Sequence, residues 1–182
     1  MGMLYNRDMP DPLCFGAKVS TYFRSYVREM GKRLGIDPNY LMACMAFETA
    51  RTFSPSITNA AGSGATGLIQ FMPATAQALG TTTEELAKMS AVQQLVYVEK
   101  YFRPRKGKLK TLSDVYMAIL WPRAIGQPDT HVIFRESDPK HPKRYIQNAK
   151  LDWDDDGCIT KAEATRKVAR LLGVGLQDGN AA

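Results

Sequence analysis

The sequence predicts an all-α protein, and three observations lead to this fold class. Apolar residues recur at helical spacing in several segments, and stretches rich in proline, glycine or small polar residues separate these segments. No useful run of residues alternates between apolar and polar in the manner of a strand. The chain has 182 residues, which supports one domain of ordinary size with a small appendage.

Two helices are predicted in the first quarter of the chain. Residues 17–34 carry apolar residues three or four positions apart, namely Val19, Phe23, Tyr26, Val27, Met30 and Leu34. Asp37 then supplies a helix N-cap and Pro38 the first helical position. The helix that follows, residues 38–48, is apolar on nearly every side, so we expect it to be the buried central helix.

The rest of the chain predicts shorter helices and irregular connections. Small and polar residues over 51–66 predict a loop, and a helical pattern then covers 67–79, interrupted or restarted at Pro73. Four prolines within 122–142 indicate an irregular connection. Further helices are predicted over residues 83–89 and 90–102, with Thr83 and Ser90 as N-caps, and over 112–121 and 162–172.

The composition excludes several function classes. Three scattered cysteines and two isolated histidines have neither disulfide-framework nor zinc-ligand spacing. The net charge of +6 favours an anionic partner. Five of the eight residues in 103–110 are basic, which is typical of a solvated loop and also suits anionic cell-envelope polymers. Zinc-finger, RNA-binding and helix-turn-helix patterns are absent, so no nucleic acid partner is expected.

No segment has the pattern of a membrane anchor or a leader. The densest apolar run, residues 41–47, is far shorter than the roughly 20 residues of a membrane helix. Residues 1–12 contain an early Arg7, an aspartate on each side of Pro10 and no apolar core, so they do not predict a signal peptide. We expect a monomer that does not insert into membranes.

Glu48 is a candidate general acid. It follows the apolar stretch Ala43 to Phe47 at the end of the predicted central helix. A carboxyl group in such surroundings is partly desolvated, which raises its pKa toward the range that acid catalysis near neutral pH requires. The residues alone leave two alternatives, an exposed helix-end residue or an ion-pair partner for Arg51.

Two motifs extend from this glutamate. The first is Glu48-Thr49, and the second is Gly67-Leu-Ile-Gln70-Phe-Met-Pro73-Ala-Thr-Ala76. Together they resemble the soluble lytic transglycosylase family, which is related in fold to goose-type lysozymes and carries Glu-Ser and then Gly-Leu-Met-Gln with a following Met-Pro-x-Thr-Ala. The resemblance covers about residues 38–102 and implies a lysozyme-like helical fold with a sugar-binding cleft.

The resemblance also implies roles for single residues. Glu48 is the catalytic acid, Gln70 lines the cleft near the reacting sugars, and Met72 packs beside a bound sugar. Gly67, which lacks a Cβ, keeps the chain slim where the glycan passes. If the resemblance to the family is set aside, the simplest interpretation of Gln70 is an ordinary polar residue at a helix start, and that of Met72 is a core methionine.

A third motif departs from the family pattern. The family carries Ala-Tyr-Asn, whereas this chain has Tyr116-Met-Ala-Ile-Leu-Trp121-Pro122 with no asparagine. This resembles a phage branch in which a Tyr-x-Ala helix ends at a proline. The resemblance then implies that Tyr116 keeps the role of the motif tyrosine, whose hydroxyl hydrogen-bonds the acid. Trp121 is either a sugar-stacking platform or a core residue.

A second, independent signal lies near the C-terminus. The twelve residues from Asp152 to Glu163 fit the calcium loop of an EF-hand at every ligand position, and Gly157 permits its sharp turn. The expected Ca²⁺ ligands are Asp152, Asp154, Asp156, the carbonyl of Cys158, Thr160 directly or through water, and Glu163 with both oxygens. The alternative is a solvated acidic turn that caps the following helix. A lone loop favours a structural clip over a sensor, which needs a paired loop.

The sequence therefore predicts a peptidoglycan-degrading enzyme with a helical lysozyme-like fold. We expect a lytic transglycosylase domain over 1–144, an EF-hand-like calcium segment over 145–173 and a flexible tail over 174–182. The expected phage origin places the protein at the host cell wall, either after release from the cytoplasm or on the virion. The alternatives are an inverting lysozyme-type hydrolase and a non-catalytic wall-binding virion protein. A transglycosylase is favoured because residues 49–83 contain no Asp or Glu that a hydrolase needs as its base.

Overall fold

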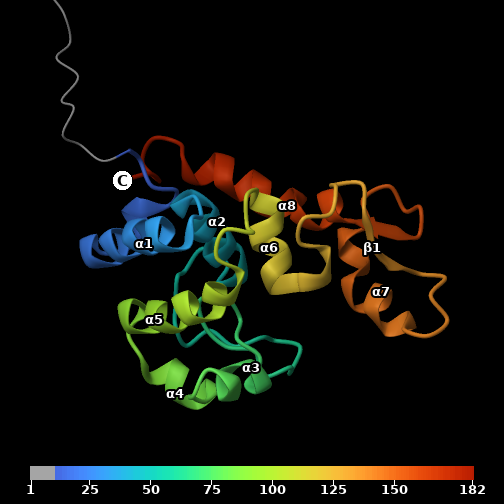
Figure 1. Cartoon of the computed structure of the whole chain (residues 1–182), viewed down its shortest axis with the longest axis horizontal. Coiled ribbons are helices and arrows are strands. Elements are labelled where there is room, and N and C mark those ends of the chain that lie inside the picture. The colour runs from blue at the N-terminus through green and yellow to red at the C-terminus, as the bar shows by residue number, and fades with distance from the viewer. Residues whose placement is uncertain (1–10) are drawn as a thin grey trace, which may run out of the picture.

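The computed structural model describes residues 11–182, and helices dominate it (Figure 1). Helices account for 53% of the structure and strands for 6%, which confirms a mostly helical protein. Residues 1–10, on which the expectation about a signal peptide mainly depends, lie outside the described residues. Within the described part of the chain, no helix is long and apolar enough to cross a membrane.

Helices α1 and α2 begin where local capping chemistry starts them. Helix α1 spans Thr21–Leu34, and the Ser20 side chain accepts a hydrogen bond from the Phe23 N–H. The predicted start at residue 17 was too early, because Val19 is extended and separates α1 from the short 3₁₀ turn η1, Gly16–Lys18. Helix α2 spans Pro38–Glu48 with Asp37 as its N-cap, as predicted.

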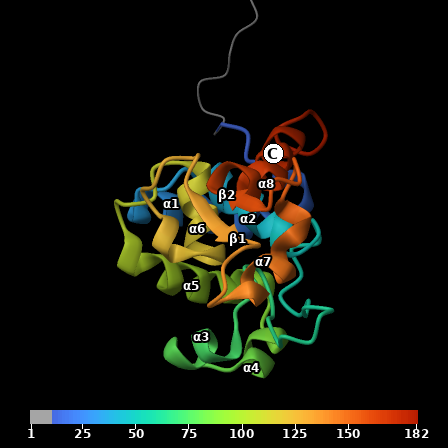
Figure 2. The ribbon, with the colours of Figure 1, turned by 90° about the vertical axis from the view of Figure 1, so that its right-hand side faces the viewer.

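Three helices follow the long loop. They are α3 (Pro73–Ala78), α4 (Thr83–Lys88) and α5 (Ala91–Phe102). Helix α3 begins at Pro73 rather than at residue 67. Residues 66 and 71 pair as a β-bridge, and this pairing prevents the segment between them from forming a helix. Thr82, not Thr83, caps α4, whereas Ser90 caps α5 as predicted. Helices α3 and α4 form a small lobe beyond α5 in two perpendicular views (Figures 1 and 2).

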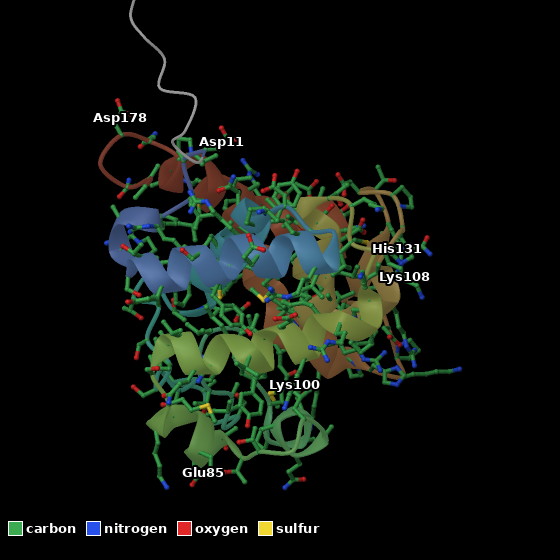
Figure 3. The ribbon with its side chains drawn as sticks, turned by 60° about the vertical axis from the view of Figure 1, so that its left-hand side comes forward. Asp11, Glu85, Lys100, Lys108, His131 and Asp178 are labelled. Carbon is green, nitrogen blue, oxygen red and sulfur yellow. The ribbon has the colours of Figure 1, made fainter. Side chains whose placement is uncertain are left out.

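The basic loop over residues 103–110 starts with the 3₁₀ turn η2, Arg103–Arg105. Arg105 is not a free cation, since its guanidinium lies 5.0 Å from the ring centroid of Tyr101 and donates to the Tyr101 carbonyl. Lys108 projects from the surface of this loop (Figure 3). Helix α6, Leu112–Leu120, follows and ends before the 3₁₀ turn η3, Pro122–Ala124.

The C-terminal third contains two strands that the sequence did not predict. Strand β1 (Val132–Arg135) pairs antiparallel with β2 (Cys158–Thr160). Each strand is too short for alternation to be recognised, and β2 lies inside the predicted calcium loop. Between and after them come α7 (Pro142–Asn148), the 3₁₀ turn η4 (Ala149–Leu151) and α8 (Lys161–Gly175).

Helix α2 forms the centre of the hydrophobic core, as its composition predicted. Residues 41–46 are all buried, and α2 packs against α1, α6 and α8. A buried ion pair joins two of these neighbours, because Lys161 at the start of α8 lies 2.6 Å from Asp114 of α6. Glu48, the candidate acid at the end of α2, is therefore attached to a helix that its neighbours hold rigidly in the core.

The predicted flexible tail is held in place instead. Backbone hydrogen bonds pair Leu13 with Ala182 in both directions, and the Ala17 N–H donates to the Asn180 carbonyl. The sequence did not reveal these contacts, because they are made by backbone groups rather than by particular side chains. The described start of the chain and its C-terminus consequently lie side by side (Figure 1).

Candidate active site

Glu48 is the last residue of α2 and the only carboxylate of that helix. The core around the helix shields its carboxyl group from water, and this desolvation raises the pKa of Glu48 to about 7. Within residues 11–182, the Glu48 carboxylate forms no ion pair or hydrogen bond, and Arg51 is exposed rather than paired with it. A carboxyl group with this pKa holds and releases a proton near neutral pH.

The chain turns sharply directly after Glu48. Thr49 fixes the turn, because its hydroxyl donates to the Met45 carbonyl at 2.7 Å and accepts from the Phe53 N–H at 3.0 Å. Three non-glycine residues here have positive φ angles: Ala50 (48°), Arg51 (66°) and Phe53 (52°). Such left-handed conformations cost roughly 1–3 kcal/mol each and are kept where the surrounding structure enforces them. The backbone of Glu48 is therefore fixed by helix α2 before it and by this turn after it.

Two tyrosines lie close to Glu48. Tyr116 on α6 is almost fully buried, and burial together with the nearby negative charge of Glu48 raises its pKa well above the usual value. Burial and the Glu48 charge also raise the pKa of Tyr101 on α5, although Arg105 opposes them. No hydrogen bond links Tyr116 to Glu48 in the described structure, and the Tyr101 hydroxyl donates to the Ala118 carbonyl. The sequence did not single out Tyr101.

Gln70 organises the loop that faces the end of α2. Its side-chain amide donates to the carbonyls of Ile57 and Gly67, both at 3.2 Å, and its own φ is 52°. These bonds tie the two ends of the loop together. Gln70 is half-buried, so the structure gives it a positioning role and leaves its predicted contact with sugars as a prediction.

The structure gives a reason for Gly67 that the sequence did not show. A Cβ at this position would lie 2.3 Å from Oε1 of Gln94, so this buried side chain requires the glycine, and the passage of glycan beside Gly67 stays a prediction. Gln94 on α5 accepts from the Leu68 N–H and donates to the carbonyls of Pro55 and Leu86. It thus joins the loop to α4 and α5. In the sequence, Gln94 stands out as a polar residue on the apolar face of the helix that became α5, and this pattern could have identified it.

Met72 and Trp121 occupy different surroundings. Met72, the N-cap residue of α3, is 47% exposed and is therefore not the core methionine of the alternative interpretation. Trp121 is half-buried and packs edge-on against Phe134 of β1, with 5.2 Å between ring centroids. Met72 is thus available to a ligand, whereas Trp121 is mainly part of the packing between α6 and β1.

The other carboxylates considered for the role of a second catalytic group lie in different places. Asp114 is buried in its ion pair with Lys161 and also accepts from the Gly126 N–H. Glu84 and Glu85 lie on the exposed face of α4, where Glu85 pairs with Lys88 (Figure 3). Burial is the cause of the raised pKa of Glu48, with no contribution from a neighbouring carboxylate in the described residues.

The predicted calcium loop brings three of its candidate ligands together. Carboxylate oxygens of Asp152, Asp154 and Asp156 all lie within 4.8 Å of one another. Gly157 has a φ of 77°, as its expected turn requires. One carboxylate oxygen of Asp152 accepts from the Tyr145 hydroxyl at 2.6 Å, and the other is buried without a hydrogen-bond partner. A buried oxygen with no donor is a free ligand position for a hard cation.

The other candidate ligands surround this cluster without joining it. Glu163 accepts from the Trp153 N–H at 3.2 Å and forms a capping box with Thr160 at the start of α8. Cys158 lies in β2, where its thiol contacts the Arg135 side chain. Residues 158–160 of the loop pair with β1 instead of with a second calcium loop.

Comparison with known proteins bears on the site directly. Residues 25–110 match the family model of the transglycosylase SLT domain. This match indicates a peptidoglycan lytic transglycosylase. No curated protein matches the chain. The match confirms the predicted enzyme class and substrate polymer.

The SLT match includes some of the candidate residues and not others. Glu48, Gln70 and Met72 fall inside residues 25–110, whereas Tyr116 and the acidic loop from Asp152 lie beyond them. Helices α2 to α5 and most of α1 lie within the matched part, and α6 and α8 pack against α2. The acid and its loop thus lie within the matched residues, and the C-terminal third of the chain lies beyond them.

Proposed function

We propose that this lytic transglycosylase cleaves the β-1,4 bond between N-acetylmuramic acid and N-acetylglucosamine with Glu48 as its acid. The observation that carries the proposal is a desolvated carboxyl group with a pKa of about 7 at the end of a rigid buried helix. Such a group is protonated in a large fraction of molecules near neutral pH, as proton donation to a leaving oxygen requires.

The reaction needs only this one carboxyl group. Glu48 protonates the glycosidic oxygen, and the bond between that oxygen and the anomeric carbon of muramic acid breaks. The Glu48 carboxylate then takes the proton of the C6 hydroxyl of the same sugar, and the C6 oxygen attacks the anomeric carbon. The product is a 1,6-anhydromuramic acid end, and the carboxyl group regains its proton.

The rival mechanism is inverting hydrolysis, which needs a second carboxylate roughly 6.5–9.5 Å from the acid to activate water. Asp114 is neutralised by Lys161, and Glu84 and Glu85 are on the exposed surface of α4. This arrangement favours the transglycosylase reaction. Gln70 and Met72 are proposed to contact the glycan, Gln70 from the ordered loop and Met72 from an exposed position, whereas the buried Tyr116 is proposed to serve substrate binding from beside the acid.

Mass spectrometry of released muropeptides tests this proposal. Digestion of purified peptidoglycan is expected to leave 1,6-anhydro ends, which lack the one water that hydrolysis adds. Reducing muramic acid ends as the main product would instead identify a hydrolase with a base elsewhere. A protein that binds peptidoglycan but releases no fragments on a zymogram would contradict the role of Glu48 altogether.

We further propose that the loop from Asp152 to Glu163 binds Ca²⁺ as a structural clip. The support is the cluster of three carboxylates, the partnerless buried oxygen of Asp152 and the all-oxygen donor set. Asp152, Asp154 and Asp156 would hold the ion, with the Cys158 carbonyl, Thr160 and Glu163 completing the site. Bound Ca²⁺ would neutralise the acidic loop and join η4 to α8.

A phage origin is proposed from the third motif, in which Tyr116-Met-Ala118 leads to a helix that ends before Pro122. Detection of this chain by mass spectrometry in purified virions, or only in the lysate of infected cells, would distinguish a virion-borne enzyme from an endolysin. Its presence in uninfected bacteria that lack a prophage would contradict the phage origin.

A further inference from the structure

A basic groove lies next to the acid and has no role in the reaction described above. It has a volume of about 560 Å³, and α8, the end of α2 and the acidic loop form its walls. Four basic residues line the groove, namely Arg51, Arg166, Lys167 and Arg170. Two aromatic residues, Phe47 and Trp153, also line it. Most of these residues lie outside the residues that match the transglycosylase domain.

The four cations of the basic groove have no anionic partner in the part of the chain that the structure describes. Among residues 11–182, none of their side chains forms an ion pair or a hydrogen bond, and no acidic residue lines the groove. Two other arginines, Arg33 and Arg103, do form ion pairs, both with Glu99, and Arg33 donates to it twice. Four unpaired cations around one concave surface favour binding of an anion.

Trp153 gives the basic groove a flat apolar surface. It is 43% exposed, and the Arg166 guanidinium lies 4.2 Å from its ring centroid. Lys167 approaches the same ring at 5.7 Å. The Trp153 N–H donates to Glu163, so the backbone of this residue is fixed to α8. An aromatic ring beside forked cations suits a ligand with both apolar and carboxylate groups.

Phe47 connects the basic groove with the catalytic residue. It precedes Glu48 in α2, lines the groove and packs edge-on against Tyr116, with 5.5 Å between ring centroids. Tyr116 in turn lies close enough to Glu48 to feel its charge. The basic groove and the acid therefore share the end of α2, where Phe47 and Arg51 line the groove on either side of Glu48 in the sequence.

We propose that the basic groove binds the peptide stems of peptidoglycan through their free carboxylates, an inference that rests on the proposed function of Glu48. Each stem is attached to muramic acid, the sugar whose bond the enzyme cleaves, so a stem leaves the glycan near the acid. Its carboxylates match the fork geometry of arginine, and its alkyl parts suit Trp153. The groove thereby makes peptide-bearing glycan a better substrate than bare glycan.

Two matched double variants test this proposal on two substrates. Arg166→Gln with Arg170→Gln removes two charges from the groove, and Lys106→Gln with Lys108→Gln removes two from the exposed basic loop. Each full-length variant is assayed on peptide-bearing peptidoglycan and on glycan stripped of its stems by an amidase. The groove variant is expected to raise KM about tenfold on the peptide-bearing substrate only. The loop variant is expected to retain the wild-type preference.

Two results would overturn the proposal. One is a wild-type enzyme that cleaves both substrates with the same KM, and the other is a groove variant that keeps the full preference for peptide-bearing glycan. An equal loss on both substrates would assign the groove to the glycan itself and would also contradict the proposal.

Binding of a free stem peptide separates this proposal from the catalytic one. Isothermal titration of the Glu48→Gln protein with a synthetic stem tetrapeptide is expected to show binding that weakens about tenfold in the groove variant. This result is independent of whether Glu48 is the acid. If the peptide does not bind, whereas teichoic acid or duplex DNA binds in a manner that depends on Arg166 and Arg170, the groove serves a phosphate polymer and the proposal is wrong.

Discussion

Glu48 and Asp152 are two shielded carboxyl groups with opposite protonation chemistry. Burial raises the pKa of Glu48 to about 7, because no donor in the described structure compensates the loss of water. The pKa of Asp152 is lowered, first by the hydrogen bond from the Tyr145 hydroxyl and then by backbone N–H groups of its loop, against the effect of desolvation. Donors, not burial alone, decide whether a shielded carboxyl holds a proton or keeps a negative charge.

The backbone after each carboxylate explains the difference in donors. Both residues lead into turns with left-handed residues, Ala50 and Arg51 after Glu48, and Asp155 and Gly157 after Asp152. After Glu48, the Arg51 N–H donates to the Ala46 carbonyl and so closes the helix end. After Asp152, the Gly157 N–H donates to the carboxylate itself at 3.0 Å. The turn after Glu48 donates no hydrogen bond to its carboxyl group, which can therefore carry a proton. The turn after Asp152 donates to its carboxylate and so stabilises the negative charge.

The largest expected effect is the loss of lysis in Glu48→Gln. The amide keeps the shape of the side chain but has no acidic proton, so turnover on peptidoglycan is expected to fall by roughly 10²–10⁴-fold. Turbidity loss of a cell-wall suspension measures the rate, and circular dichroism verifies the fold.

Glu85→Gln is the matched control for this variant. It makes the same chemical change on the exposed face of α4, where Glu85 only pairs with Lys88, and is expected to retain wild-type activity (Figure 3). Near-normal turnover in Glu48→Gln, or a comparable loss in Glu85→Gln, would show that the acid has been assigned to the wrong carboxylate.

Calcium is expected to stabilise the native protein. An ion that binds only the folded state contributes about 2.7 kcal/mol when its concentration is 100 times its dissociation constant. The melting temperature should therefore rise with Ca²⁺ and fall with chelator, and Glu163→Ala should remove most of the rise. Because Glu163 also caps α8, its replacement destabilises the apo protein as well.

A pair of neighbouring variants isolates the calcium effect from the charge effect. Asp154→Asn removes a cluster carboxylate, whereas Asp155→Asn removes the same charge from a residue outside the cluster whose φ of 55° asparagine tolerates. Only Asp154→Asn is expected to reduce the calcium-dependent rise. Equal behaviour of the two variants, or a wild type that melts at the same temperature in chelator, would leave the loop as a solvated acidic turn.

The sequence predicted those parts of the molecule that depend on local chemistry. Asp37 and Pro38 start α2, and the apolar residues before Glu48 lie in the core and shield its carboxyl group, so the position of the acid follows from adjacent residues. The roles of Gly67 and Gln94 were not predictable, because they meet only when α5 folds against the loop. Tyr101 was missed for the same reason, since nothing in its own segment indicates that Glu48 lies nearby.

The pH dependence of stability gives a smaller test of the contrast between the two carboxylates. A folded-state pKa above the unfolded value means that ionisation of Glu48 destabilises the protein. The cost is absent below about pH 4, grows as pH rises toward 7 and is complete above it. Glu48→Gln is therefore expected to be more stable than wild type by about 3 kcal/mol at pH 8 and to match it at pH 4.

Urea unfolding at both pH values measures this difference, with Glu85→Gln as the control for removal of a surface carboxylate. Glu85→Gln is expected to change stability by about 0.5 kcal/mol or less at either pH. A Glu48→Gln protein that is less stable than wild type at pH 8 would mean that the carboxylate has a stabilising partner and that its pKa is not raised.

The smallest expected effect concerns Cys158, whose part in the proposed calcium site is limited to its backbone carbonyl. The thiol contacts the Arg135 side chain at 3.1 Å and plays no part in the carboxylate cluster. Cys158→Ser keeps the backbone and nearly the size of the side chain, so the calcium dissociation constant is expected to change by no more than about twofold, or 0.4 kcal/mol. Titration calorimetry measures this constant, and Asp156→Asn, two residues earlier in the same loop, is expected to weaken binding far more. If Cys158→Ser weakens calcium binding as strongly as Asp156→Asn, the sulfur itself contributes to the site, and the ion is a softer metal than calcium.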